Sequence, residues 1–247
     1  MTFMITFTEM CLPGLKAIIS IAKNENVDLE MIELEPMEKL TYTEDLAKLS
    51  VHVKKGAQVE ELMTLVKEGN FSVLKDLEHQ VQIIEVANRL GKATVSKVLI
   101  QEVTEQKQKG VGIKSLIKVV QQGKETLEEV IMDVSKEFGT NSKPLKEMAA
   151  VGMLLSEGVT CDEVVTMLNV GMLPALQAPE AQVPMTSIVT KKGHSGVVCE
   201  VLVEESTNTI ENLKPVPESA KLLEYKNLLH KAVTSSTNVQ SKSVLKF

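Results

Sequence analysis

The chain has 247 residues, 43% of them hydrophobic and 24% charged, a composition that supports a folded protein with a sizeable core. Its formal net charge of −6 argues against broad electrostatic binding to nucleic acids or anionic membranes, while leaving open a local basic patch that binds nucleic acid. Tryptophan is absent and only two tyrosines and five phenylalanines are present, against 12 methionines, so we expect an aliphatic helical core rather than a β-sandwich built on large rings.

The sequence predicts a cytoplasmic or otherwise intracellular protein. No apolar run approaches the roughly 18 residues that span a bilayer. The opening "MTFMITFTEM" lacks both the basic segment and the cleavage site of a secretory signal. The three cysteines Cys11, Cys161 and Cys199 are far apart and odd in number, so they indicate no disulfide framework.

Residues 2–8 alternate β-forming residues and predict a short strand. The segment "CLPG" (11–14) follows, and a predicted helix follows that. This order is similar to the opening of the thioredoxin and glutathione-transferase families, a resemblance that implies a thiol-dependent enzyme. Cys11 is the reactive residue in that hypothesis, because a thiolate at a helix N-terminus is stabilised by the helix dipole. The chain departs from the redox families in having no second cysteine to complete Cys-x-x-Cys.

One short pattern occurs three times: "KGAQVEELMTLVKEGN" (55–70), "KGVGIKSLIKVVQQGK" (109–124) and "EGVTCDEVVTMLNVGM" (157–172). In each copy the two glycines are 13 residues apart, and the same five positions between them are apolar. Four of these five positions lie on one face of a 3.6-residue helix, and glycine is the usual residue at C′ after a helix ends. Each copy therefore predicts a helix of about three turns with one buried face.

The similarity extends upstream, where "IIEVANRLG" (83–91) and "IMDVSKEFG" (131–139) stand in one register. The sequence thus predicts a helical repeat domain over 1–171, with copies of a three-helix unit of about 48 residues at 13–69, 73–123 and 122–171. The first copy carries an insertion, "VDLEMIELEPM", which alternates like a strand. The unit resembles armadillo and HEAT repeats in architecture, and a globular helical bundle is the alternative.

Beyond residue 171 the predicted character of the chain changes. Three prolines in 172–184 predict a linker. The module 185–247 is expected to be α+β: two β-rich runs around "KKGHSG" (191–196) predict a hairpin, 219–236 predicts a helix, and "VLKF" predicts a last strand. The predicted fold class is therefore mainly α, α-solenoid-like or bundled, with a small α+β C-terminal part.

Part of this C-terminal region also resembles the minor matrix protein of filoviruses. The similarity lies in the order of "SIVTKKGHSGVVCEV", "KPVP", "LLEYKNLLHKAVTSS" and "SVLKF", and it covers about a quarter of the chain with gaps. It implies a viral matrix or nucleocapsid-associated structural protein. No motif in it assigns a functional residue.

The residues that could perform chemistry are scattered. The four histidines have no cysteine or carboxylate at ligand spacing, and "NRLGKAT" (88–94) lacks the earlier glycine of a phosphate-binding loop. We therefore expect no catalytic, cofactor or metal site. The leading hypothesis is a non-enzymatic structural protein that binds a protein partner or self-associates through a helical surface.

The candidate interface lies at the end of the third copy, in "MLNVGMLPALQAP". Met167, Met172, Leu173 and Leu176 run there into proline-rich chain, and uncovered apolar residues commonly mark an interface. The alternative is that these residues cover the edge of an internal core.

Leu116 tests the buried face of the repeated helix. Leu116→Ala is expected to lower the free energy of unfolding by about 2–5 kcal/mol, because it leaves a cavity in the core. Chemical denaturation measures this. A change below about 0.5 kcal/mol is typical of an exposed position and would contradict the predicted face.

Overall fold

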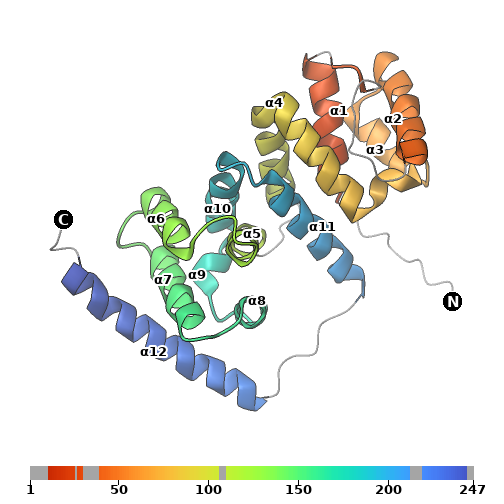
Figure 1. The fold of residues 1–247 in the computed structure, drawn as a ribbon. Coiled ribbons are helices and arrows are strands. Elements are labelled where there is room, and N and C mark those ends of the chain that lie inside the picture. The colour runs from red at the N-terminus through yellow and green to blue at the C-terminus, as the bar shows by residue number, and fades with distance from the viewer. Residues whose placement is uncertain (1–10, 26, 30–38, 106–109, 212–218, 244–247) are drawn as a thin grey trace. The chain divides into compact units, whose positions relative to one another are not determined.

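A computed structural model describes residues 11–25, 27–29, 39–105, 110–211 and 219–243, and every regular element in these ranges is a helix (Figure 1). The chain divides into two compact units. Unit 1 comprises Met1–Gln106 and Thr190–Asn212, and unit 2 comprises Lys107–Val189 and Leu213–Phe247.

Unit 1 is built around helix α4. Its elements are α1 (Pro13–Glu25), α2 (Lys39–Lys54), α3 (Val59–Lys67), the short 3-10 helix η2 (Ser72–Lys75), α4 (Leu77–Glu105) and α11 (Ser195–Glu211). Both α1 and α11 pack against α4. Helix α4 bends at Gly91, where a Cβ atom would lie 3.1 Å from Cγ1 of Ile21, so the absence of a side chain lets α1 approach closely.

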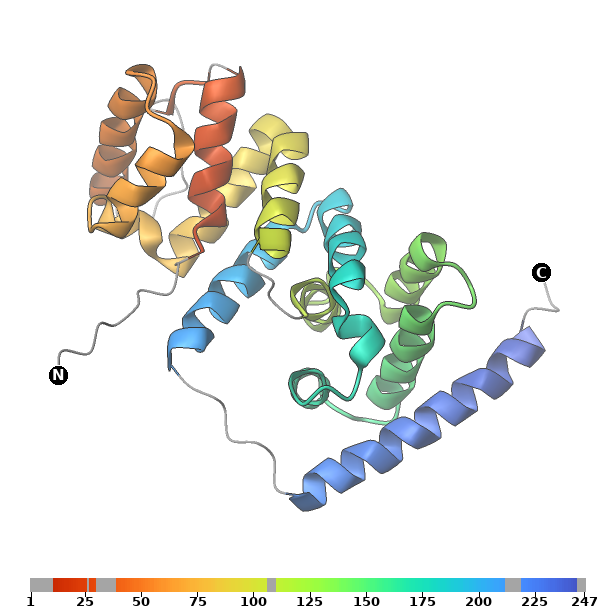
Figure 2. The ribbon, with the colours of Figure 1, turned by 180° about the vertical axis from the view of Figure 1, so that it is seen from behind.

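Unit 2 surrounds helix α5. It contains α5 (Val111–Gln121), α6 (Leu127–Phe138), α7 (Lys143–Ser156), α8 (Cys161–Asn169), α9 (Pro174–Gln177), most of α10 (Pro179–Lys191), and α12 (Ser219–Ser243). Residues 111–117 of α5 are all buried, which makes it the core helix of this unit. Helix α7 packs against α6 and against α12, and α12 is a single long helix in the view from behind (Figure 2).

The thrice-repeated pattern forms α3, α5 and α8, and all three helices end in the same way. In α3 the N–H of Gly69 donates to the Val66 carbonyl (3.2 Å) and the N–H of Asn70 donates to the Leu65 carbonyl (3.1 Å), which is a Schellman motif with a left-handed glycine. The corresponding bonds close α5 at Gly123 and α8 at Gly171. The helices and their glycine ends are thus confirmed.

The predicted buried face is also present. Leu116, Ile117 and Val164 are buried, and Val165 is half-buried. The aliphatic residues between the paired glycines therefore form core rather than surface in both α5 and α8.

The two units share local structure at a spacing of 102 residues. Helices α3 and α8 begin at Val59 and Cys161, and helices α4 and α10 begin at Leu77 and Pro179, each pair 102 residues apart. The glycine ends of α3 and α8 follow the same spacing. The first and third copies of the sequence pattern therefore continue alike beyond the glycine, through η2 and α4 in one unit and through α9 and α10 in the other.

A buried glutamine occupies the same place in each unit. Gln80 Oε1 accepts from the Leu15 N–H (3.1 Å) while its Nε2 donates to the Leu74 carbonyl. In unit 2, Gln182 Oε1 accepts from the Gly112 N–H (2.9 Å) and its Nε2 donates to the Leu176 carbonyl. Each glutamine thus joins the first turn of a core helix to the short helix, η2 or α9, that precedes its own helix.

The predicted β-hairpin is wrong, because no strand occurs in the described ranges and its residues form the end of α10 and the start of α11. Met185, Ile188 and Val189 are buried at helical spacing, so the β-branched residues of this segment line a helix core. Glycine 193, with φ of 94°, makes the turn between the helices. The expected strands at 2–8 and 244–247 lie outside the described residues, as does most of the insertion strand.

The predicted linker at 172–184 is also corrected, because it forms α9 and the first half of α10. Pro174 and Pro179 are the first residues of these two helices, a position at which the missing N–H of proline costs no helical hydrogen bond. Two of the three prolines thus mark helix starts, and the third, Pro184, lies inside α10.

Gln182→Ala is expected to destabilise the protein because it leaves the Gly112 N–H and the Leu176 carbonyl buried without this partner. A buried polar group that loses its hydrogen bond costs about 1–3 kcal/mol. The urea unfolding midpoint of this variant is compared with that of Gln121→Ala, which replaces an exposed glutamine of α5. Equal midpoints for the two variants would contradict the role assigned to Gln182.

Candidate binding surface on helix α12

Helix α12 is held to unit 2 by one narrow face. Tyr225 and Ala232 are buried, Leu229 is half-buried, and these positions share a helix face that packs on α7. Helix α12 has 25 residues and α7 has 14, so α12 is longer by about 16 Å at 1.5 Å per residue. Most of the described side chains of α12 are therefore exposed.

Two polar contacts fix the position of α12 beside the turn between α7 and α8. Lys231 Nζ forms an ion pair with Glu157 Oε1 at 3.3 Å. The Tyr225 hydroxyl hydrogen-bonds the Glu163 carboxylate in the first turn of α8. Glu163 also belongs to the capping box of α8, because its Oε2 accepts from the Thr160 N–H (2.9 Å) and its own N–H donates to the Thr160 hydroxyl (3.3 Å).

These contacts change the acid strength of both partners. The pKa of Glu163 is lowered by the hydrogen bonds from the Thr160 backbone and hydroxyl, and further by Tyr225 and Lys221. The pKa of Tyr225 is raised by burial and by the negative charge of Glu163. At neutral pH a neutral tyrosine thus donates to an ionised glutamate.

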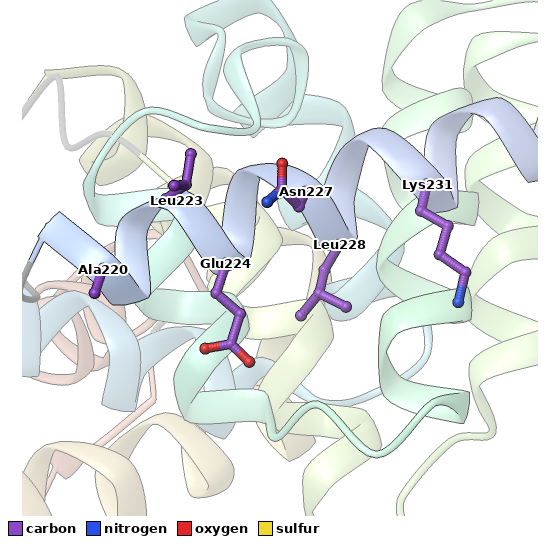
Figure 3. Close-up of a pocket in the computed structure, with 6 residues that line it drawn as sticks. All are labelled: Ala220, Leu223, Glu224, Asn227, Leu228 and Lys231. Carbon is purple, nitrogen blue, oxygen red and sulfur yellow. The ribbon is translucent and has the colours of Figure 1, made fainter.

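The outward side of α12 carries a continuous face that the structure leaves open. Figure 3 looks onto it: Leu223 and Asn227 project to one edge of the helix, and Glu224, Leu228 and Lys231 project to the other. Leu223 is 61% exposed, the most exposed of the large apolar side chains identified in the described part of the chain. Beside it, a groove of about 250 Å³ separates α12 from the α7–α8 turn and is lined by Val159 among others.

The structure does not place the predicted interface residues on this surface. Met167, Leu173 and Leu176 are fully buried in unit 2, and Met172 is half-buried. Helix α9 folds Leu173 and Leu176 inward, so the alternative that they belong to the core is the correct one. A binding interface requires solvent-exposed atoms, and Met167, Leu173 and Leu176 are fully buried.

Cys11 is buried beside an ion pair. Its side chain is 2% exposed and Sγ donates a hydrogen bond to Glu102 Oε2 (3.1 Å), with Lys16 on the other carboxylate oxygen. Burial raises the pKa of Cys199 and of Cys161.

The described residues contain no group of three or more His, Cys, Asp and Glu side chains placed to hold a metal ion. Within the same ranges, no helix combines the length and the apolar character needed to cross a bilayer. No protein-family model, curated protein or solved structure matches the chain.

Tyr225→Phe tests the contact that positions α12. Without the hydroxyl, the pKa of Glu163 is expected to rise towards its ordinary value, as followed by NMR titration of the carboxyl carbon. Thr160→Ser, which keeps the capping hydroxyl, is expected to leave that pKa unchanged.

The same variant has a predicted pH signature in stability. Because the folded-state pKa of Glu163 is lowered, its stabilising effect is present above its unfolded pKa and disappears as pH falls through the folded value. The stability difference between Tyr225→Phe and the unmodified chain should therefore shrink on acidification. A difference that stays constant to low pH would contradict the contact.

Proposed function

We propose that the chain is a non-enzymatic protein-interaction and assembly protein, and that the outward face of α12 binds an amphipathic helix of a protein partner. The observation that carries the proposal is the exposed Leu223 at the edge of an ordered helical face whose other edge carries the Lys231–Glu157 ion pair. Exposed apolar side chains on a rigid element, rimmed by charge, are typical of binding surfaces.

The spacing of the face favours a helical partner. Its residues occupy positions i, i+3, i+4, i+7, i+8 and i+11 of α12, over about 16 Å along one side of the helix. They are Ala220, Leu223, Glu224, Asn227, Leu228 and Lys231. Side chains in such rows form ridges and holes into which the rows of a second helix fit.

The surroundings of the face support a specific mode of binding. The α7–α8 turn provides a wall on one side through Glu157 and Val159, so the partner meets a groove rather than an isolated cylinder. Glu224 and Lys231 give the face one acidic and one basic end. A partner helix with the opposite order of charges is therefore favoured over one with the same order.

Leu223→Asp is expected to weaken capture of the partner at least about tenfold while leaving the melting temperature nearly unchanged, because a charge replaces an exposed apolar contact. The tagged full-length chain is used as bait, and the captured protein is identified and quantified by mass spectrometry. Cross-linked peptides should include residues 219–231.

The matched control is Met132→Asp, since Met132 is 50% exposed on α6 in the same unit. This variant should capture the partner as the unmodified chain does. Equal capture by both variants would remove the outward face of α12 as the binding surface.

A further inference from the structure

We infer that the helix bound to this face is α12 of a second copy of the chain, lying antiparallel about a two-fold axis that passes between Asn227 and Leu228. The inference rests on the proposed function, because it assigns an occupant to the same face. It is carried by the arrangement of charge on α12.

Glu224 and Lys231 lie seven residues apart and therefore on the same side of the helix. Both line the open face, and Leu223 and Leu228 stand at its two edges (Figure 3). Rotation about an axis between residues 227 and 228 exchanges position 224 with position 231. In an antiparallel pair, Glu224 of each copy thus faces Lys231 of the other, and the contact is made twice.

The charges of Glu224 and Lys231 disfavour a parallel arrangement of the two helices. With two parallel helices in register, Glu224 would face Glu224 and Lys231 would face Lys231, so both attractive contacts would become repulsive. Charged residues beside the apolar seam commonly decide helix orientation in this way. The face is therefore complementary to itself in one orientation only, as a two-fold interface requires.

The side chains remain accessible for this pairing. The Lys231 side chain is 66% exposed although it pairs with Glu157 of its own chain, so its ammonium group can serve a second carboxylate. The contact area is small and its ion pairs face water, so the association is expected to be weak and to weaken further with salt.

Charge reversal provides the test. In Glu224→Lys two lysines face each other at both contacts, and in Lys231→Glu two glutamates do. Each variant alone is expected to dimerise at least about tenfold more weakly than the unmodified chain. An equimolar mixture of the two variants should regain association, because both contacts of the mixed dimer are attractive.

Sedimentation velocity of the full-length chains at low salt measures the dissociation constants, and thermal melts verify that each variant is folded. Glu128→Lys on α6, also at an exposed glutamate, is the control and should dimerise normally. Raising the salt concentration to about 1 M should weaken the unmodified dimer, because the screening length falls to about 3 Å.

A monomeric unmodified chain at every concentration would overturn the inference, and so would a mixture that associates no better than its components. The proposed function is judged separately. If Leu223→Asp loses a different protein that the unmodified chain captures, the binding surface stands and only its occupant is wrong.

Discussion

The fold depends on a close helix crossing in each unit that is secured by one buried glutamine. Gly14 and Gly112 bring α1 and α5 so near to the helix that carries the glutamine that a Cβ would lie 2.3 Å and 2.6 Å from the Gln80 and Gln182 carbonyl oxygens. At that separation the amide side chain reaches across and satisfies a main-chain N–H in the first turn of the core helix. A buried amide that loses such partners is costly, so the crossing is specified by chemistry as well as by shape.

This crossing sets the position of the elements around it. The same glutamine holds the carbonyl of Leu74 in η2 or of Leu176 in α9, the short helix that follows α3 or α8. Helix α9 packs against α8, whose first turn presents Glu163 to Tyr225 of α12. The placement of the outward face of α12 is therefore connected, through α8 and α9, to the core of unit 2.

The sequence predicted the helices between the paired glycines because two strong local signals coincide there, the apolar spacing of a helix and a residue suited to a left-handed end. The prediction from sequence is wrong over 172–203. There the prolines indicate a linker and the β-branched residues indicate strands only when each residue type is judged by its average structural preference. Tertiary packing overrides those preferences when a β-branched residue fills a buried helix face, as Val197 and Val201 do. The sequence does not indicate the buried role of Gln182, because a single polar residue in a helix usually faces solvent.

The proposed binding surface on α12 was not predicted for a related reason. A helix was expected at 219–236, but its apolar residues suggest only that one side is buried and do not say which leucine remains outside. That distinction depends on where α7 and α8 contact α12, which is long-range information. The predicted interface at 167–176 is mostly buried, because the short helix α9 turns Leu173 and Leu176 inward.

The division of unit 1 between two distant parts of the chain governs the order in which the protein can assemble during synthesis. Helix α4 has α11 as a packing partner, and the unit 2 segment Lys107–Val189 lies between them in the sequence. When α4 leaves the ribosome its α11-binding side is still bare, and it stays bare until translation has passed residue 211. In unit 2, the side of α7 that packs against α12 likewise stays uncovered until α12 has been translated. A nascent chain therefore keeps apolar helix surface uncovered until α11 and α12 have been synthesised.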